Sequence, residues 1–169
     1  MELKEYIQSE INGQKRNIDR VLKDLTQPEY AWRPACGCNS IGLILFHVAK
    51  SEDSFVQKML NDKQELWETD EWFKKMELDA KEAGAHYTVE QVDAFCAPKL
   101  DAILEYTAAV RAQTLACLDS MQPADFERKI KVPWGEMPAI MIFSMIVGHA
   151  TQHLGEVSYL RGLQRGMDK

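Results

Sequence analysis

Apolar residues recur at helical spacing in four long segments of the chain. The first, residues 3–25, places isoleucine, valine and leucine side chains on one side of a helix and ends before residues 27–28, Gln-Pro. The second begins at residues 39–40, Asn-Ser, which are good N-cap residues, and extends to about residue 61. Alternating runs of β-branched residues, which would predict strands, are missing. The pattern therefore predicts an all-α protein.

The other two segments lie in the second half of the chain. The third spans about residues 89–121 and starts from a Thr88 cap, with Pro98 either kinking the helix or marking its true beginning. The fourth spans about residues 138–165, with a proline suited to its first turn and a glycine at its end. Between the second and third segments, residues 62–89 form a long connection that is expected to hold a short helix. This order predicts a four-helix bundle.

The amino-acid composition indicates one globular domain and argues against some classes of partner. The chain has 169 residues, 46% of them hydrophobic and 27% charged, which fits one globular domain over residues 1–169. The net charge of −6 and the lack of a basic cluster argue against nucleic acid as a partner. The longest apolar run is far shorter than the roughly 20 residues that cross a bilayer, and the N-terminus does not resemble a signal peptide. A cytoplasmic protein without membrane contact is expected.

Three ionisable residues share the inward face of the fourth segment. Residues of an α-helix advance by about 100°, so His149 and His153 differ by about 40°, and Glu156 lies about 20° from His149 on the other side. This face also carries the apolar residues expected to point into the core. Two histidines one turn apart on a core-facing stripe offer two nitrogen ligands to one metal ion.

A third histidine, His47, falls on the inward stripe of the second segment, with Ile44, Ser51 and Phe55. Burying a neutral imidazole without a partner costs about 1–3 kcal/mol, whereas a divalent ion satisfies one nitrogen on each ring. Three protein ligands leave at least one coordination position open, which is typical of catalytic sites, where a bound water has its pKa lowered to about 7. The sequence therefore predicts a metal site formed by His47 and the two histidines of the fourth segment.

Glu156 is the candidate catalytic residue. Its carboxylate is suited to orienting a ligating imidazole or to accepting a proton from a nucleophile, and the alternative is an ion pair with Arg161. His86, in a polar connection, is expected to be solvated. Cys36 and Cys38 are expected to be reduced loop thiols, because a structural zinc site usually needs two such pairs.

Several of these motifs together resemble the DinB (damage-inducible) superfamily, which includes YfiT-like and thiol-dependent transferase branches. The similarity covers nearly the whole chain. It is carried by AWRPACGCNSIGLILFHVAKSE, with its Trp-Arg-Pro and Asn-Ser-Ile motifs and His47, and about 100 residues later by GHATQHLGEVSYLRGLQRG, with His149, His153, Gly155 and Glu156.

The resemblance implies an up-down-down-up four-helix bundle with a long crossing between the second and third helices, often assembled as a homodimer. It implies that His47, His149 and His153 bind a divalent metal, which in the family is zinc, nickel, iron or manganese. Some branches activate a low-molecular-weight thiol such as bacillithiol or mycothiol, and others resemble hydrolases. Many members have no known reaction.

Two functional hypotheses remain open from the sequence. In the first, the protein is a metal-dependent enzyme, a thiol S-transferase or a hydrolase, that acts on a small molecule. In the second, it is a non-enzymatic metal-binding or small-molecule-binding bundle whose metal stabilises helix packing. No Gly-rich phosphate loop, GxSxG elbow or dinucleotide fingerprint is present, so a nucleotide cofactor is not expected.

Overall fold

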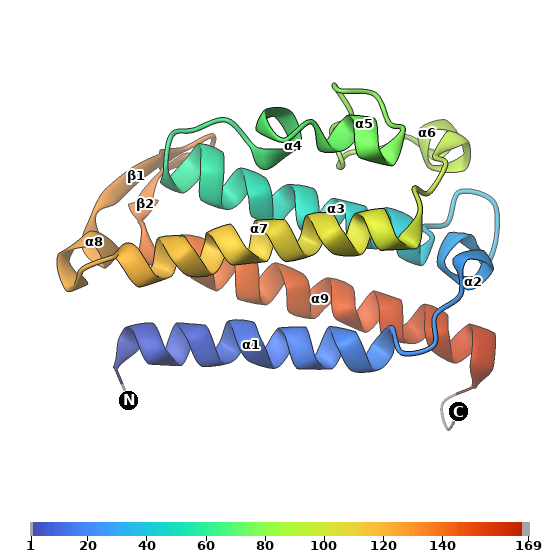
Figure 1. Cartoon of the computed structure of the whole chain (residues 1–169), viewed down its shortest axis with the longest axis horizontal. Helices are drawn as coiled ribbons and strands as arrows, with labels where there is room; N and C mark the ends of the chain where they lie inside the picture. The colour runs from blue at the N-terminus through green and yellow to red at the C-terminus, as the bar shows by residue number, and fades with distance from the viewer. Residues whose placement is uncertain (1, 167–169) are drawn as a thin grey trace.

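Four long helices lie side by side in the computed structural model, which describes residues 2–166 (Figure 1). They are α1 (Leu3–Val21), α3 (Ile41–Asp53), α7 (Leu100–Ser120) and α9 (Ile140–Arg165). Helix α3 continues directly into a π-helical segment, η1 (Ser54–Leu60). In Figure 1, α1 and α9 run from left to right, and α3 and α7 run in the opposite direction. The predicted all-α fold class is confirmed.

Prolines and caps set the helix boundaries. Thr88 caps a short separate helix, α6 (Val89–Ala94), and the long third helix, α7, begins just after Pro98, which is one of the two possibilities that the sequence left open. A proline cannot donate the backbone hydrogen bond that a continuous helix needs there. The first helix ends at Val21 rather than residue 25, since Asp24 adopts a left-handed backbone conformation with φ of 57°. A short helix, α2 (Gln27–Ala31), follows.

A small β-hairpin precedes α9, and here the prediction that strands are missing was wrong. After α8 (Pro123–Glu127), strand β1 (Lys129–Val132) pairs antiparallel with β2 (Gly135–Pro138). The two apolar residues of β1 are buried and alternate with exposed lysines. Four residues are too few for this alternation to stand out in the sequence. Pro138, which was expected in the first turn of the last helix, instead pairs with Lys129 in the hairpin. Helix α9 (Ile140–Arg165) therefore begins two residues later than predicted.

The long connection between η1 and α7 crosses over α3 and α7, along the upper side of Figure 1. Within residues 62–89, where the sequence predicted one short helix, it contains two, α4 (Leu66–Thr69) and α5 (Trp72–Met76), and α6 follows them. Trp67 and Trp72 are buried at 1% and 5% exposure, so they hold the connection against the bundle. A buried ion pair between Lys50 and Glu65 adds a polar link to α3, with 2.5 Å between Nζ and Oε2. The crossing is therefore an ordered part of the core.

The apolar core consists of two clusters that follow one another along the bundle. One cluster joins the first half of α3 and of α7 to the last turns of α9 and to the crossing. The other joins the first half of α1 and of α9 to η1, the end of α7 and the hairpin. Polar side chains lie between the two clusters, and the candidate site is among them.

None of the helices within residues 2–166 is both long enough and apolar enough to cross a membrane.

Candidate metal centre

The three histidines on the inward stripes meet at the interface between α3 and α9. His47 comes from α3, and His149 and His153 come from successive turns of α9. The Nε2 atom of His149 lies 3.0 Å from Nε2 of His47 and 3.2 Å from Nε2 of His153. The ring centroids are 4.5–4.8 Å apart, and all three rings are half-buried. Three ring nitrogens therefore face one small volume.

Hydrogen bonds orient two of the rings. The Nδ1 atom of His47 lies 2.7 Å from the carbonyl oxygen of Gly84, and Nδ1 of His153 lies 2.9 Å from Oε2 of Glu156. A carbonyl or carboxylate oxygen only accepts, so both Nδ1 atoms carry the proton. In the neutral ring this leaves Nε2 as a lone pair that points at the third histidine. The two contacts select the tautomer that binds a metal through Nε2.

Burial keeps the rings of His149 and His47 in the neutral, ligating form. Burial, together with the neighbouring His153 and His47, lowers the pKa of His149 to about 4. Burial also lowers the pKa of His47, against the opposing effect of its hydrogen bond to Gly84. Metal binding requires neutral imidazole, because protons and metal compete for the same lone pair. At neutral pH the rings of His149 and His47 are therefore uncharged. A metal ion does not have to displace a second ring proton from either of them.

The spacing of the nitrogens fits a transition metal ion. Metal–nitrogen bonds of about 2.0–2.1 Å place two ligands about 2.9 Å apart at a right angle and about 3.3 Å apart in a tetrahedron. The observed separations of 3.0 and 3.2 Å fall in this interval. His47 and His153 each direct an Nε2 lone pair at the Nε2 atom of His149, and one metal ion at this point would accept lone pairs from all three rings. Among residues 2–166, no other His, Cys, Asp or Glu joins this group of three.

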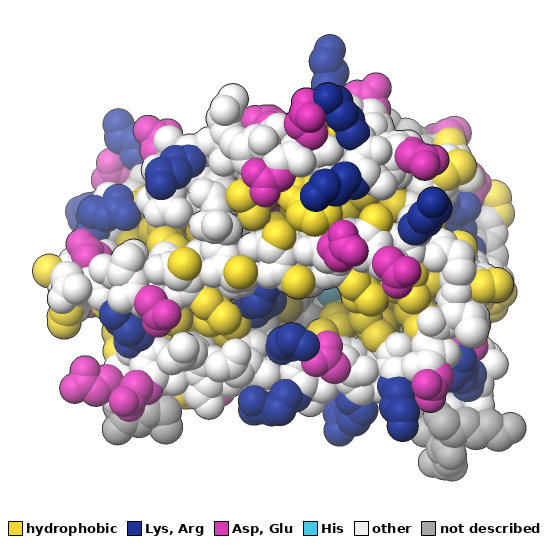
Figure 2. Space-filling view, viewed as in Figure 1, with side chains coloured by type: hydrophobic (Ala, Val, Ile, Leu, Met, Phe, Trp, Pro, Cys, Tyr) yellow, Lys and Arg dark blue, Asp and Glu magenta, His cyan; other side chains and the backbone are white. Residues whose placement is uncertain are grey.

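The site is reached from outside through the bundle. Figure 2 shows a hollow between α1 and α7, with hydrophobic side chains on its walls and a histidine side chain visible inside it. A Lys or Arg side chain is visible in the same hollow. Phe55 borders the histidines, with its ring centroid 5.8 Å from that of His149. The hollow between α1 and α7 therefore leads inward to a histidine side chain.

The remaining candidate residues lie in different places. Glu156 is at the edge of the site, with its side chain 43% exposed, and contacts His153. The alternative of an ion pair with Arg161 is not observed, because Arg161 contacts Glu29, with 3.4 Å between Nη1 and Oε1. His86 is exposed, as predicted. The two cysteines of the Cys-Gly-Cys motif are free thiols in a loop.

The contact from Gly84 could not be derived from the sequence. Gly84 has a φ of +73°, and a Cβ atom there would lie 2.9 Å from Cβ and 3.0 Å from Cγ of Lys50. The backbone thus approaches α3 closely enough for its carbonyl to reach His47. The only sequence signal is a glycine in a polar connection, which is typical of many turns.

We expect Gly84→Ala to weaken metal binding about 10- to 100-fold, the range typical for loss of a residue that orients a ligand. The added methyl group meets Lys50, and the left-handed backbone is strained for alanine, so the loop shifts and His47 loses its acceptor. Competition with a chromophoric chelator measures the affinity. Gly148→Ala is the matched control, since an added Cβ at this α9 glycine has no atom of another element within 4 Å. Equal affinities of the two variants would contradict the role of Gly84.

Comparison with known proteins gives a family and a fold. The model of the DinB superfamily matches residues 10–157. A crystal structure described as a conserved protein from Enterococcus faecalis superposes with a TM-score of 0.83 at 21% sequence identity, covering 96% of this chain and 97% of that one. No curated protein matches the sequence significantly. The family model spans most of the chain, including all three histidines and Glu156. The protein therefore belongs to the DinB superfamily.

Proposed function

We propose that this protein binds one divalent metal ion through His47, His149 and His153 and is a metal-dependent enzyme acting on a small molecule. The convergence of the three Nε2 atoms carries the proposal, with that of His149 lying 3.0 Å from that of His47 and 3.2 Å from that of His153. Zinc and nickel suit three neutral nitrogens best, with iron and manganese as alternatives. The two reaction classes we consider are the transfer of a low-molecular-weight thiol to an electrophile and the hydrolysis of an ester or amide.

A catalytic role is favoured by the way the site is built. The donor set contains three protein nitrogens among the described residues, whereas structural zinc sites are closed by four protein ligands. The site also adjoins a hollow, where a histidine side chain is visible from outside (Figure 2). When bound, the metal supplies Lewis acidity at a coordination position that the protein leaves free.

The residues of the chain have separable tasks in this proposal. His47 and His153 are held by Gly84 and Glu156 and present Nε2. The carboxylate of Glu156 has one oxygen on His153 and is 43% exposed, so it is also accessible to a proton released by a thiol or water. A carboxylate within hydrogen-bond reach of the nucleophile is suited to act as a general base. Phe55 supplies an apolar wall beside His149.

Glu156→Gln separates the two tasks of this side chain. The amide oxygen still accepts from Nδ1 of His153, so we expect metal affinity to stay within about threefold of the native value. Proton transfer is lost, so kcat falls about 10²- to 10⁴-fold while KM changes little. Glu156→Ala is the comparison, since it removes the hydrogen bond as well and lowers metal affinity about tenfold or more. Unchanged kcat in both variants would exclude proton transfer by Glu156.

Elemental analysis of the native protein tests the metal site. The protein is purified without chelator and without nickel resin, so that the metal loaded in the cell is retained. We expect about one equivalent of a single divalent metal per chain, which follows from one group of three converging nitrogens. Metal that is far below stoichiometric, and that is not taken up on reconstitution, would contradict the site.

A substrate panel then separates the reaction classes. A thiol transferase consumes an electrophile only when both metal and thiol are present, whereas a hydrolase cleaves an ester or amide with metal alone. A stoichiometric metal with no turnover across the panel would favour the second function, a non-enzymatic bundle. That function has an observation in its favour, because the ligands join α3 to α9 and a bound ion would stabilise this interface.

A further inference from the structure

A cavity lies between the C-terminal end of α1 and the last turns of α9, at the right of Figure 1. Its volume is about 370 Å³, within the range of pockets that hold small molecules. Four of its lining residues are basic, Arg20, Lys23, Arg161 and Arg165, and one, Asp24, is acidic. The members from the two helix ends lie at least 138 positions apart in the sequence, so no basic run reveals this cluster.

The cavity is separate from the metal centre. Arg161 follows His153 by eight residues, which corresponds to about 12 Å along the axis of α9. The two groups also lie on different sides of this helix. Arg161 faces α1, where its Nε atom donates to the carbonyl oxygen of Val21, whereas His149 faces His47 of α3. A ligand in the cavity is therefore distinct from one at the histidines.

Two of the four basic side chains are fixed by the end of α1. Arg161 donates from Nε to the carbonyl oxygen of Val21 at 3.3 Å and from Nη2 to that of Lys23 at 3.2 Å. Arg165 donates from Nη2 to the carbonyl oxygen of Asp24 at 2.6 Å. These contacts satisfy carbonyl groups at the helix end, which explains why two arginines lie here. They also hold both guanidinium groups beside the cavity.

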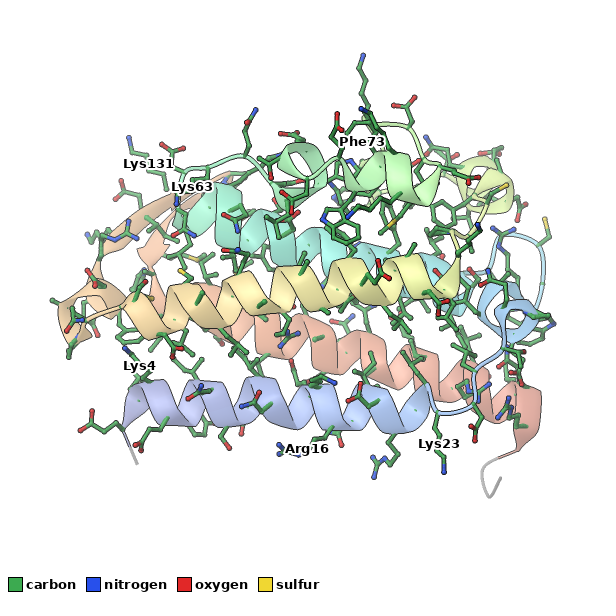
Figure 3. The ribbon with its side chains drawn as sticks, in the orientation of Figure 1. Lys4, Arg16, Lys23, Lys63, Phe73 and Lys131 are labelled. Carbon is green, nitrogen blue, oxygen red and sulfur yellow. The ribbon has the colours of Figure 1, made fainter. Side chains whose placement is uncertain are left out.

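Other donors around the cavity are not used by the protein. Arg20 and Lys23 are exposed, and only their backbone atoms take part in hydrogen bonds within residues 2–166. Figure 3 shows Lys23 extending from the end of α1 into solvent. Arg165 uses Nε and Nη2 on Glu29 and Asp24, whereas Nη1 has no partner in the described chain. This atom is not one of the buried, unpartnered side-chain atoms, so it is accessible.

The charge around the cavity is positive, although the whole chain carries −6. The four basic side chains are opposed by Asp24 and by Glu29, which contacts Arg161 at 3.4 Å and Arg165 at 2.5 Å. The net charge of this group is therefore +2. A phosphate group carries about −1.5 to −2 at pH 7 and has three acceptor oxygens, so it balances this charge. One carboxylate balances only half of it.

We propose that this cavity binds a phosphate group, with Arg20, Lys23 and Nη1 of Arg165 donating to its oxygens. Guanidinium and ammonium groups form short, charge-assisted hydrogen bonds with phosphate. The arginines fixed by the end of α1 are already in place, so binding does not have to order them. The inference goes beyond the proposed function and does not depend on the metal centre.

Titration of the native protein with glycerol 3-phosphate, followed by NMR, tests the proposal. We expect saturable shifts of the backbone amide signals of Lys23, Gly162 and Gly166, which line the cavity. Glycerol, which lacks the phosphate, should leave these signals unshifted. Glycerate, which carries a carboxylate instead, should bind about tenfold more weakly, because it makes fewer charge-assisted hydrogen bonds. Inorganic phosphate should cause the same shifts, and the tighter of the two phosphates shows whether the ligand is an ester or the free ion.

Two variants change the charge of the cavity in opposite directions. Arg20→Ala/Lys23→Ala removes two exposed cations without breaking a side-chain contact, and it should weaken glycerol 3-phosphate binding about tenfold. Asp24→Asn removes the acidic group and should tighten binding about two- to threefold. Asparagine tolerates the left-handed backbone at this position, where φ is 57°. A gain in affinity cannot result from unfolding.

Arg16→Ala is the matched control. Arg16 lies on α1 one turn before Arg20, does not line the cavity and points away from the bundle in Figure 3. Because water and salt screen exposed charges, its loss should change the affinity for glycerol 3-phosphate by no more than about twofold. Equal losses of affinity in Arg16→Ala and in Arg20→Ala/Lys23→Ala would mean that binding follows the net charge of the chain, which overturns the site.

Two further outcomes would overturn the inference. Shifts confined to the surroundings of His149 and His153 would mean that the phosphate binds the metal instead. Sulfate, phosphate and glycerate binding with equal affinity would mean that the cavity attracts any anion without recognising phosphate. Neither outcome affects the metal stoichiometry. A protein that takes up no metal but still shows the expected shifts would lose the proposed function and keep the phosphate site.

Discussion

The double variant His149→Ala/His153→Ala is expected to lose tight metal binding altogether. It removes two of the three converging nitrogens and leaves His47 alone, which is too few ligands to hold a divalent ion. Structural zinc bound by four ligands is worth about 10–16 kcal/mol, so two ligands correspond to about 6 kcal/mol, a loss of about ten thousandfold. Elemental analysis after reconstitution with one equivalent of zinc measures this directly.

Helicity should be preserved in this variant. Alanine has the highest helix propensity, and both positions lie in the interior of the 26-residue helix α9. His86→Ala is the control, since this exposed histidine lies outside the group of three and its loss should leave the metal content unchanged. Stoichiometric zinc in the double variant, together with native circular dichroism, would show that the metal binds elsewhere.

The second large effect is expected from Asp53→Ala, which should lower the free energy of unfolding by about 3–5 kcal/mol. Asp53 is 1% exposed and is a second polar link between α3 and the crossing, beside the Lys50–Glu65 ion pair. Its carboxylate accepts the backbone N–H groups of Leu66 and Trp67, each at 3.0 Å, and the hydroxyl of Tyr106 at 2.7 Å. Alanine leaves three donors without an acceptor in the core. Urea unfolding followed by circular dichroism gives the difference.

Two further variants make this result specific. Tyr106→Phe removes only the hydroxyl and is expected to cost about 1 kcal/mol, and it remains measurable if Asp53→Ala does not fold. Asp101→Ala, an exposed aspartate in the first turn of α7, should change stability by about 0.5 kcal/mol or less. A cost for Asp53→Ala no greater than that of Asp101→Ala would mean that Asp53 does not help to hold the crossing against α3.

Local rules predicted most of the bundle. The caps at Ser40 and Thr88 form as expected, because a side-chain oxygen that accepts a backbone N–H three residues later needs no distant partner. The hairpin at residues 129–138 was missed for the converse reason. Its two four-residue strands are stabilised by burial of Ile130 against the second apolar cluster, which the local sequence does not encode.

The candidate site was likewise predicted from the sequence only in part. Helical periodicity alone selected His47, His149 and His153, because an angle of about 100° per residue decides which side chains share a face. It left open whether Glu156 contacts a histidine or Arg161, and the structure places it on His153. It gave no sign of Gly84, since its carbonyl oxygen contacts His47, 37 positions away in the sequence.

The sequence by itself determined the helical class, the inward stripes and the histidines they carry, because these depend on the geometry of a single helix. Only the tertiary structure decided the axial register of α3 against α9, and with it the distances between Nε2 atoms. It also decided which distant backbone groups and carboxylates orient the rings. The physical reason is that register is set by the packing of the two apolar clusters on either side of the site, a property of all four helices together.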